Sequence, residues 1–205
     1  MIMKLILIRH GQTEWNVQRR AQGQTDIPMD ENGLRQARAV ARRLRTDNID
    51  GLYTSPLSRA HETAAEIGAL IGIEPIVMPE LTEIQFGLWE GRTFNELKAI
   101  YPALFEQWSA APYGCRAPQA ETLEEILFRV RPVVRRIAAY CRNAVIVSHT
   151  LPLKLIIADA IGLDFNRIHH LKLDNCGYTL LNMDNNGQGS LMVMNDISHM
   201  RGAAL

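Results

Sequence analysis

Two histidines occupy matching positions in the sequence, each directly after a short apolar segment. His10 and Arg9 follow residues 4–8 (KLILI), and His149 follows residues 144–148 (AVIVS). Both segments are predicted to be buried strands, and in an open α/β sheet ligands bind beyond the carboxyl ends of the strands. If the two strands are neighbours in a parallel sheet, the two imidazoles face each other across one crevice.

Two arginines are expected at the same edge of the sheet. Arg9 adjoins His10, and Arg59 lies in the first turns of the helix that follows the predicted strand 51–54. A guanidinium group pairs with two phosphate oxygens at once and keeps its charge. Gly11 removes a side chain where backbone N–H groups would approach an anion. Together these residues predict a compact pocket for a dianion such as a phosphate group.

The same residues suit the cleavage of a phosphate monoester. A neutral histidine attacks phosphorus without a metal ion and forms a phosphohistidine, which divides one hard step into two. The leaving oxygen then needs a proton, which a carboxyl group with a raised pKa supplies. Glu83 is the strongest candidate, because it follows a predicted strand and has apolar neighbours in the sequence that exclude water; Glu14 and Glu90 are weaker candidates.

With these residues in view, the chain resembles the histidine phosphatase superfamily, the phosphoglycerate mutase-like proteins. The matching segments follow the family's order over roughly residues 4–155, and an ordered set of motifs is far more specific than a lone Arg-His-Gly. The matching segments are Arg9 to Gly11 with Thr13, Trp15 and Asn16, then Gln22 to Asp26, Gly33 to Ala37, Ser55 to Ala60, Glu83 to Gly91 and Val147 to His149.

The resemblance implies a role for each matching side chain. His10 is the residue phosphorylated in catalysis, and Glu83 acts first as general acid and then as general base toward water. The phosphoryl group or the substrate is held by Arg9, Gly11, Asn16, Gln22, Gly23, Arg59, His149 and Thr150. The family needs no metal ion, so neither a metal site nor a cofactor is expected.

Thr150 is one visible departure from the family pattern. Many members have glycine directly after the second histidine, where this chain has threonine. If the backbone N–H at this position contacts phosphate, the threonine side chain narrows the pocket or adds a hydroxyl contact. The substrate therefore does not carry over from any one relative.

Three functions are compatible with the resemblance. The favoured one is a phosphatase of small phosphorylated metabolites, and the compact length is similar to the α-ribazole phosphate and broad-specificity branches. A cofactor-dependent mutase usually adds basic residues between Glu83 and His149 to hold a second acidic group, and this chain has few there. A catalytically silent binding module usually lacks one of the core histidines or arginines, and all four are present.

Alternating strands and helices are predicted to position these residues. Beyond the two strands already named, we expect strands at 51–54 and 74–78, a closing hairpin at 178–183 and 190–194, and helices at 32–44, 55–71, 122–141 and 151–161, with shorter helices after Thr93 and Pro102. The strongest strands are apolar on both faces. This indicates an α/β fold, a three-layer α/β/α sandwich with a mostly parallel central sheet, as in phosphoglycerate mutase-like proteins.

The 205 residues fit a single domain, 1–205, with a lid-like insertion at about 84–120. Trp108 and Tyr113 in this insertion suit a core and a lid equally well. The adjacent pair His169 and His170 is not expected to bind a metal, because neighbouring side chains point in different directions on most backbones.

Composition excludes several classes of partner. The 22 basic residues equal the 22 acidic ones, so the basic surplus of a nucleic-acid-binding protein is missing. The three cysteines are unclustered, which argues against a zinc knuckle and a disulfide framework, and no apolar run approaches the length of a membrane span. We expect a cytoplasmic enzyme that acts on a small phosphate ester and binds neither nucleic acid nor membrane, with a homodimer as one option for its assembly.

Overall fold

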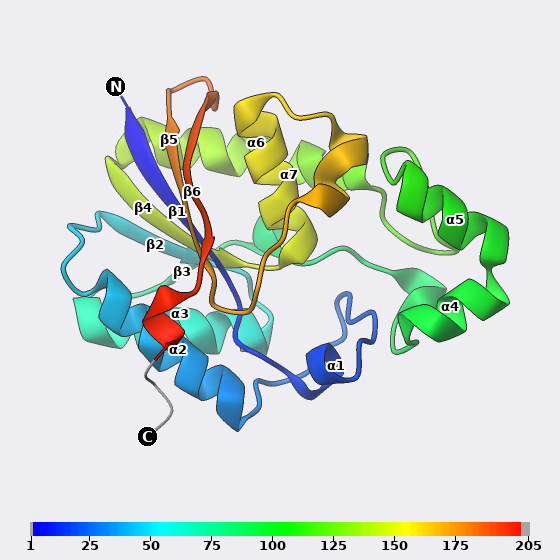
Figure 1. The fold of residues 1–205 in the computed structure, drawn as a ribbon. Coiled ribbons are helices and arrows are strands. Elements are labelled where there is room, and N and C mark those ends of the chain that lie inside the picture. Colours follow the sequence, from blue (N-terminus) through cyan, green and yellow to red (C-terminus); the bar gives the residue numbers. More distant parts are fainter. Residues whose placement is uncertain (1, 202–205) are drawn as a thin grey trace.

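The computed structural model describes residues 2–201, which form three layers around one sheet (Figure 1). The strands are β1 (Met3–Arg9), β2 (Gly51–Thr54), β3 (Ile76–Val77), β4 (Asn143–Ser148), β5 (Tyr178–Met183) and β6 (Gly189–Asp196), in the order β3-β2-β4-β1-β5-β6. The first four in this order are parallel to one another, and β5 and β6 join as an antiparallel hairpin. The predicted mostly parallel sheet is confirmed.

Helices cover both faces of this sheet. One face packs against α2 (Glu31–Leu44) and α3 (Ser58–Ile71), and the other against α6 (Leu123–Tyr140) and α7 (Thr150–Ile161) (Figure 1). Side chains of β1 alternate between the two layers. Leu5 and Leu7 join the core on the α6 and α7 side, while Ile6 and Ile8 join the core on the α2 and α3 side. A strand apolar on both faces is therefore buried on both faces.

A separate group of short elements lies beside the ends of the parallel strands. It contains α1 (Glu14–Val17), η1 (Pro79–Leu81), η2 (Gly87–Trp89), α4 (Phe94–Ile100) and α5 (Pro102–Ala110), while η3 (Phe165–His170) and η4 (Ser198–Met200) come later in the chain. Capping boxes start α4 at Thr93 and α6 at Thr122, as predicted, and Pro102 occupies the first turn of α5. Trp89 is fully buried and packs its ring near those of Phe105 and Trp108.

Two helices and one strand differ from the sequence prediction. Helix α3 begins at Ser58 rather than at residue 55, because Leu57 is extended and Ser55 turns its hydroxyl to the backbone N–H of Leu57. Strand β3 shortens to two exposed residues at the sheet edge. Helix α1 was not predicted, since four residues are too short to show a helical hydrophobic period.

The structure bears on the expectations about cysteines, metal sites and membrane spans. Cys115, Cys141 and Cys176 are all free and buried. Within the described residues, His, Cys, Asp and Glu nowhere gather in a group of three or more that would hold a metal ion. Across residues 2–201, every helix is too short or too polar to cross a membrane.

Candidate active site

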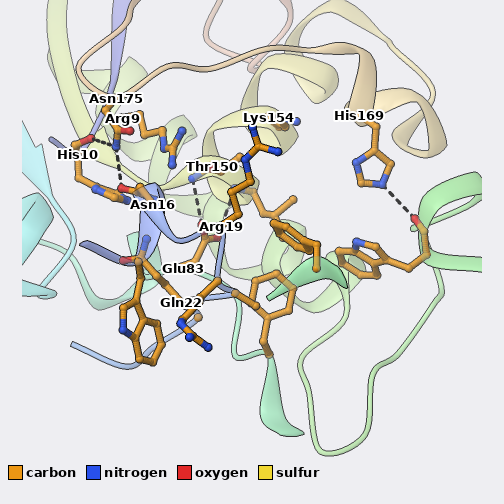
Figure 2. Close-up of a pocket in the computed structure, with 18 of the residues that line it drawn as sticks. Arg9, His10, Asn16, Arg19, Gln22, Glu83, Thr150, Lys154, His169 and Asn175 are labelled. Atoms are coloured by element: carbon orange, nitrogen blue, oxygen red, sulfur yellow. Dashed lines mark hydrogen bonds between the residues drawn. The ribbon is translucent and has the colours of Figure 1, made fainter. Parts of the chain in front are cut away.

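A cavity of about 630 Å³ opens where β1 and β4 end (Figure 2). The structure brings most of the predicted site residues to its wall: Arg9, His10, Asn16, Gln22, Gly23, Arg59, Glu83 and Thr150. His149 lies directly behind this wall, with no exposed surface, and its ring centre is 5.1 Å from that of His10. The two imidazoles meet because β1 and β4 are paired in parallel, with Arg9 opposite Ser148.

His10 is held as a neutral imidazole with one nitrogen free. Its Nδ1 lies 2.8 Å from the carbonyl oxygen of Gly11, and since a carbonyl only accepts, Nδ1 carries the proton. The lone pair is therefore on Nε2. Burial lowers the pKa of His10 well below 6.5, and the positive charges of Arg9 and Arg59 lower it further. The group is thus poised as a nucleophile at neutral pH.

His149 has one satisfied and one unsatisfied ring nitrogen. Its Nε2 lies 2.8 Å from the hydroxyl oxygen of Ser55, whereas its buried Nδ1 has no hydrogen-bond partner among the described residues. Burial and the charge of Arg59 lower the pKa of His149 well below 6.5. A buried nitrogen without a partner is costly, and an oxygen of a bound ligand would satisfy it.

The half-buried Arg9 and the fully buried Arg59 bring two positive charges that no carboxylate neutralises by a salt bridge within residues 2–201. Arg59 is fully buried and donates to the carbonyl oxygens of Thr25, at 2.9 Å, and Gly23, at 2.8 Å. Arg9 donates to the carbonyl of Leu173 at 2.8 Å. The Nε atoms of both arginines are buried and unpartnered. One half-buried and one fully buried cation, neither in a salt bridge, make a site for an anion.

Glu83 lies in the loop between η1 and η2, lines the same cavity as His10, and places its carboxylate against the first backbone N–H groups of α7. Its Oε2 accepts a hydrogen bond from the backbone N–H of Thr150 at 3.0 Å, and its Oε1 accepts from Ile84 at 3.0 Å and Leu151 at 3.3 Å. Burial is the largest influence and raises the pKa of this carboxyl group, although the N–H donors and Arg59 oppose it. A carboxyl group in this setting can hold a proton at higher pH than usual.

The amides of Asn16 and Gln22 each leave a donor group free at the cavity. Asn16 Oδ1 accepts from the backbone of Thr13 at 3.1 Å and from Asn175 Nδ2 at 3.1 Å, while Gln22 Oε1 accepts from the Thr13 hydroxyl at 3.0 Å. Neither NH₂ group has a partner in the part of the chain that the structure describes. Two amide donors therefore remain for ligand oxygens.

The backbone N–H groups of Gly11 and Thr150 already have hydrogen-bond partners within the protein. The N–H of Gly11 donates to Thr63 Oγ1 at 3.0 Å, and a Cβ there would lie 2.5 Å from Met29 Sδ and 2.6 Å from the Gly33 carbonyl oxygen. Glycine is thus needed for close packing, and its N–H is not available to an anion. The N–H of Thr150 is likewise already bound to Glu83, although the residue lines the cavity.

The weaker carboxylate candidates have other tasks. Glu90 accepts hydrogen bonds from the backbone N–H groups of Thr25 and Phe86, which holds two loops together. Gly23, at φ +54°, packs against this carboxylate, and a Cβ there would lie 2.0 Å from Glu90 Oε1. Glu14 is exposed and contacts Gln18. Glu83 is the carboxyl group that the fold brings to the histidines.

Comparison with known proteins agrees with this geometry. Residues 5–197 match the histidine phosphatase superfamily (branch 1). The chain belongs to this superfamily. It is 31% identical to phosphoserine phosphatase 1 of Hydrogenobacter thermophilus, over 89% of this chain and 88% of that protein. It is 33% identical to a probable phosphoglycerate mutase of Photorhabdus laumondii, over 85% and 82% of the two chains.

A solved structure supports the same assignment. The phosphoserine phosphatase of Entamoeba histolytica, in complex with 3-phosphoglyceric acid, superposes with a TM-score of 0.85 at 31% identity, covering 97% of this chain and 99% of that one. The phosphoglycerate mutase-like fold is confirmed. The protein is a histidine phosphatase, as predicted, and the mutase alternative is the weaker one.

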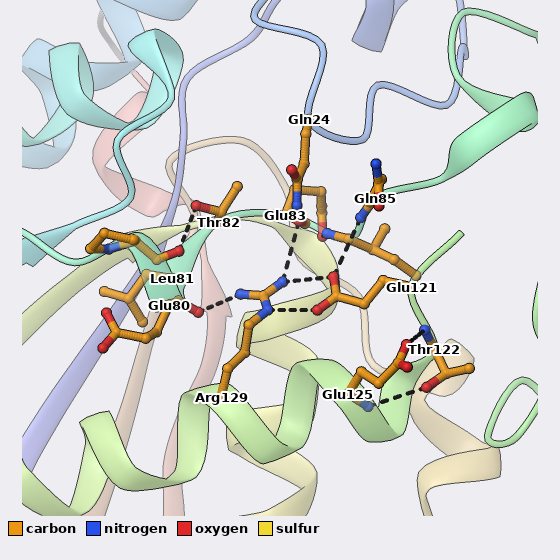
Figure 3. Close-up of polar contacts among 12 residues, drawn as sticks. Gln24, Glu80, Leu81, Thr82, Glu83, Gln85, Glu121, Thr122, Glu125 and Arg129 are labelled. Carbon is orange, nitrogen blue, oxygen red and sulfur yellow. Dashed lines mark hydrogen bonds and ion pairs between the residues drawn. The ribbon is translucent and has the colours of Figure 1, made fainter. Parts of the chain in front are cut away.

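Arg129 holds the backbone around Glu83 in this histidine phosphatase, and the sequence analysis did not predict this contact (Figure 3). Arg129 of α6 forms a two-pronged ion pair with Glu121, with Nε–Oε1 at 2.7 Å and Nη2–Oε2 at 3.0 Å. The same guanidinium donates to the carbonyl oxygen of Glu80 and, at 3.3 Å, to that of Glu83. These partners are distant in the sequence, so no local pattern predicts them.

Further residues of the cavity wall also escaped the sequence prediction. Asn175 donates to the His10 carbonyl at 2.9 Å, and Lys154 projects from α7. A signal for Lys154 was present, because it is the one charged residue between Leu151 and Ala158 in an apolar helix. Trp108 is 7% exposed, so it is part of the hydrophobic core, and it also lines the cavity.

Proposed function

We propose that this phosphatase hydrolyses small phosphate monoesters through a phosphohistidine at His10, with Glu83 as general acid and base. One observation carries the proposal. A neutral imidazole, with its lone pair on Nε2, stands in one cavity with the half-buried Arg9 and the buried Arg59, neither of which forms a salt bridge within the described residues. Nucleophile, anion site and proton donor thus meet in one place.

In the first step, the phosphate group of the substrate binds between Arg9 and Arg59. Nε2 of His10 attacks phosphorus, the N–P bond forms, and the P–O bond to the leaving group breaks. The proton of Glu83 passes to the leaving oxygen, which departs as an alcohol. The free Nδ1 of His149 and the amides of the cavity wall are the remaining donors to the phosphoryl oxygens.

In the second step, Glu83 is a carboxylate and takes a proton from a water molecule. The water oxygen attacks phosphorus, the N–P bond to His10 breaks, and inorganic phosphate leaves. Binding of a phosphate dianion near Glu83 places a second negative charge beside it, which favours the protonated form before the first step. The two arginines then favour the carboxylate after the alcohol has gone.

We infer the substrate class from the cavity and from the relatives. The cavity, at about 630 Å³, is large enough for a small phosphorylated metabolite. The Entamoeba relative was solved with 3-phosphoglyceric acid and, as a mutant, with phosphoserine. Small phosphate esters of this kind are the proposed substrates. The chemistry proposed uses neither metal nor cofactor.

We also propose that the chain acts as a single domain, with residues 84–120 as a lid. This segment contributes Phe86, Phe94, Phe105 and Trp108 to the cavity wall. Because these aromatic side chains form part of the cavity wall, the segment suits the exclusion of water during the first step. The balanced charge and the free thiols favour a cytoplasmic protein that binds neither nucleic acid nor membrane. A homodimer stays a prediction.

The test is turnover of p-nitrophenyl phosphate in the presence of EDTA. The wild type should be active, and His10→Ala should be inactive, while His61→Ala, an exposed histidine of α3, is the matched control and should keep full activity. Intact-mass analysis of acid-free quenched reactions should find one phosphoryl group on the wild type and none on His10→Ala. Absence of turnover across a panel of phosphate esters would instead favour a binding module.

A further inference from the structure

Lys154 is a positive charge without a counter-ion in an apolar helix. The residues around it in α7, from Leu151 to Ala158, are otherwise apolar, and most are buried. Lys154 itself is half-buried, lines the cavity, and forms no salt bridge or hydrogen bond within the described part of the chain. Burial, helped by the charge of Arg9 and opposed by that of Glu83, lowers the pKa of its ammonium group to about 8. Keeping such a cation is costly unless a ligand pairs with it.

Lys154 stands beside the phosphate site but outside it. It lies one helical turn after Thr150, on the same face of α7, and both residues line the cavity. Lys154 is close enough to His169 for its charge to lower the pKa of that imidazole. It is also close enough to Arg9 and Glu83 for their charges to shift the pKa of Lys154 itself. Figure 2 shows Lys154 between Arg9 and His169. A leaving group that extends from a phosphate at His10 along this wall would pass Lys154.

The other positively charged side chains of the cavity wall have other partners or are exposed to solvent. Arg9 and Arg59 provide two positive charges, which match a phosphate dianion. Arg20 donates to the Gly91 carbonyl at 2.7 Å, with Glu96 nearby, and Arg19 is exposed at the surface. One half-buried positive charge remains, and a single carboxylate matches it better than a second dianion does.

We propose that Lys154 determines substrate specificity by binding a carboxylate on the leaving group. This inference rests on the proposed function of the cavity. It assigns the substrate class as phosphate monoesters of hydroxy acids, such as phosphorylated serine or glycerate, in preference to esters that differ only by lacking the carboxylate.

The test compares matched pairs of esters. Phosphoethanolamine has hydrogen where phosphoserine has its carboxylate, and glycerol 3-phosphate has an uncharged hydroxymethyl group where 3-phosphoglycerate has its carboxylate. The wild type should prefer the carboxylated member of each pair. Lys154→Met should reduce this ratio of kcat/KM values by roughly 10- to 100-fold, the range of one charge-assisted contact, mainly through KM. Any loss common to both members cancels in the ratio.

Two variants separate charge from packing. Lys154→Arg keeps the charge and should retain most of the preference, and Lys98→Met, an exposed lysine of α4, should behave as wild type. The preference should also fade as pH rises past about 8, because the Lys154 ammonium loses its proton there, and it should persist in Lys154→Arg. A purely structural lysine would give no such pH dependence.

Binding gives a readout that does not depend on turnover. In His10→Ala protein, calorimetric affinity for phosphoserine should fall when Lys154→Met is added, whereas affinity for phosphoethanolamine should fall less. Equal losses for both esters, or a wild type without preference in turnover, would overturn the role of Lys154 while p-nitrophenyl phosphate turnover still supports the phosphatase. Failure to turn over any ester would overturn the proposed function and this inference with it.

Discussion

Replacing Arg129 with methionine should slow this phosphatase, although Arg129 lines no part of the cavity. The Arg129 guanidinium ties α6 to the carbonyl oxygens of Glu80 and Glu83, and its ion pair with Glu121 fixes its own orientation. Without it, the segment that carries Glu83 loses two of its donors. We therefore expect both lower stability and a less well-placed proton donor.

The magnitude follows from burial. The side chains of Arg129 and Glu121 are only 19% and 16% exposed. Removing one partner of a buried pair costs about 3–5 kcal/mol, and we take the lower end because both groups keep some contact with water. About 3 kcal/mol corresponds to a fall in Tm of roughly 6–12 °C for a chain of this size. A displacement of Glu83 by about 1 Å would cost on the order of 100-fold in rate.

A double variant separates these two effects. Glu121→Met with Arg129→Met removes the stranded carboxylate as well, and a buried pair replaced by apolar groups is often neutral in stability. Most of the lost Tm should return. The rate should stay low, because the carbonyl group of Glu80 still lacks its Arg129 donor and that of Glu83 keeps only the donor from Gln24. Arg116→Met breaks an ion pair whose side chains are 53% and 49% exposed, and it should change neither quantity appreciably.

The assay is kcat/KM for an alkyl phosphate and for p-nitrophenyl phosphate, with Tm measured on the same samples. A good leaving group needs little help from an acid, so Arg129→Met should slow the alkyl ester more than the aryl ester. Recovery of the alkyl-ester rate together with Tm in the double variant would refute the positioning role and leave Arg129 as a purely stabilising residue.

Three further predictions follow from the site. Burial lowers the pKa of His10 and His149 in the native state. As pH falls below about 6.5, these imidazoles are therefore protonated in the unfolded chain but stay neutral in the native state. The free energy of unfolding should therefore fall as pH drops below this value. The urea midpoint of His10→Ala should fall less steeply with decreasing pH than that of the wild type. Equal pH dependence in the two proteins would contradict the burial of His10 as a neutral group. Gly11→Ala should lower the free energy of unfolding, measured in urea, by about 1–3 kcal/mol, because the added methyl group overpacks the site. An unchanged urea midpoint would show that the neighbouring residues move apart at no cost. Inorganic phosphate at about 100 times its Kd should stabilise the wild type by about 2.7 kcal/mol in thermal shift, and an equal shift in Arg59→Met would place the anion elsewhere.

Much of the fold was readable from the sequence because its signals are local. Apolar runs of strand length marked β1 and β4, and Thr93 and Thr122 with a glutamate three residues later marked two helix starts. The convergence of His10 and His149 also followed, because parallel strands end at one edge of the sheet. The short edge strand, the start of α3 and the brief α1 were misjudged or missed, since tertiary contacts set their bounds.

Residue identity alone therefore determined the chemical groups, the two strands that carry them and the family of the chain. Only the tertiary structure decided how these groups are used. The proton on His10 Nδ1 depends on the Gly11 carbonyl, the N–H of Thr150 goes to Glu83 across 67 residues of chain, and Lys154 reaches the cavity only because α7 packs as it does. Hydrogen bonds are directional, so their partners are set by the relative placement of distant elements, which no local pattern of residues encodes.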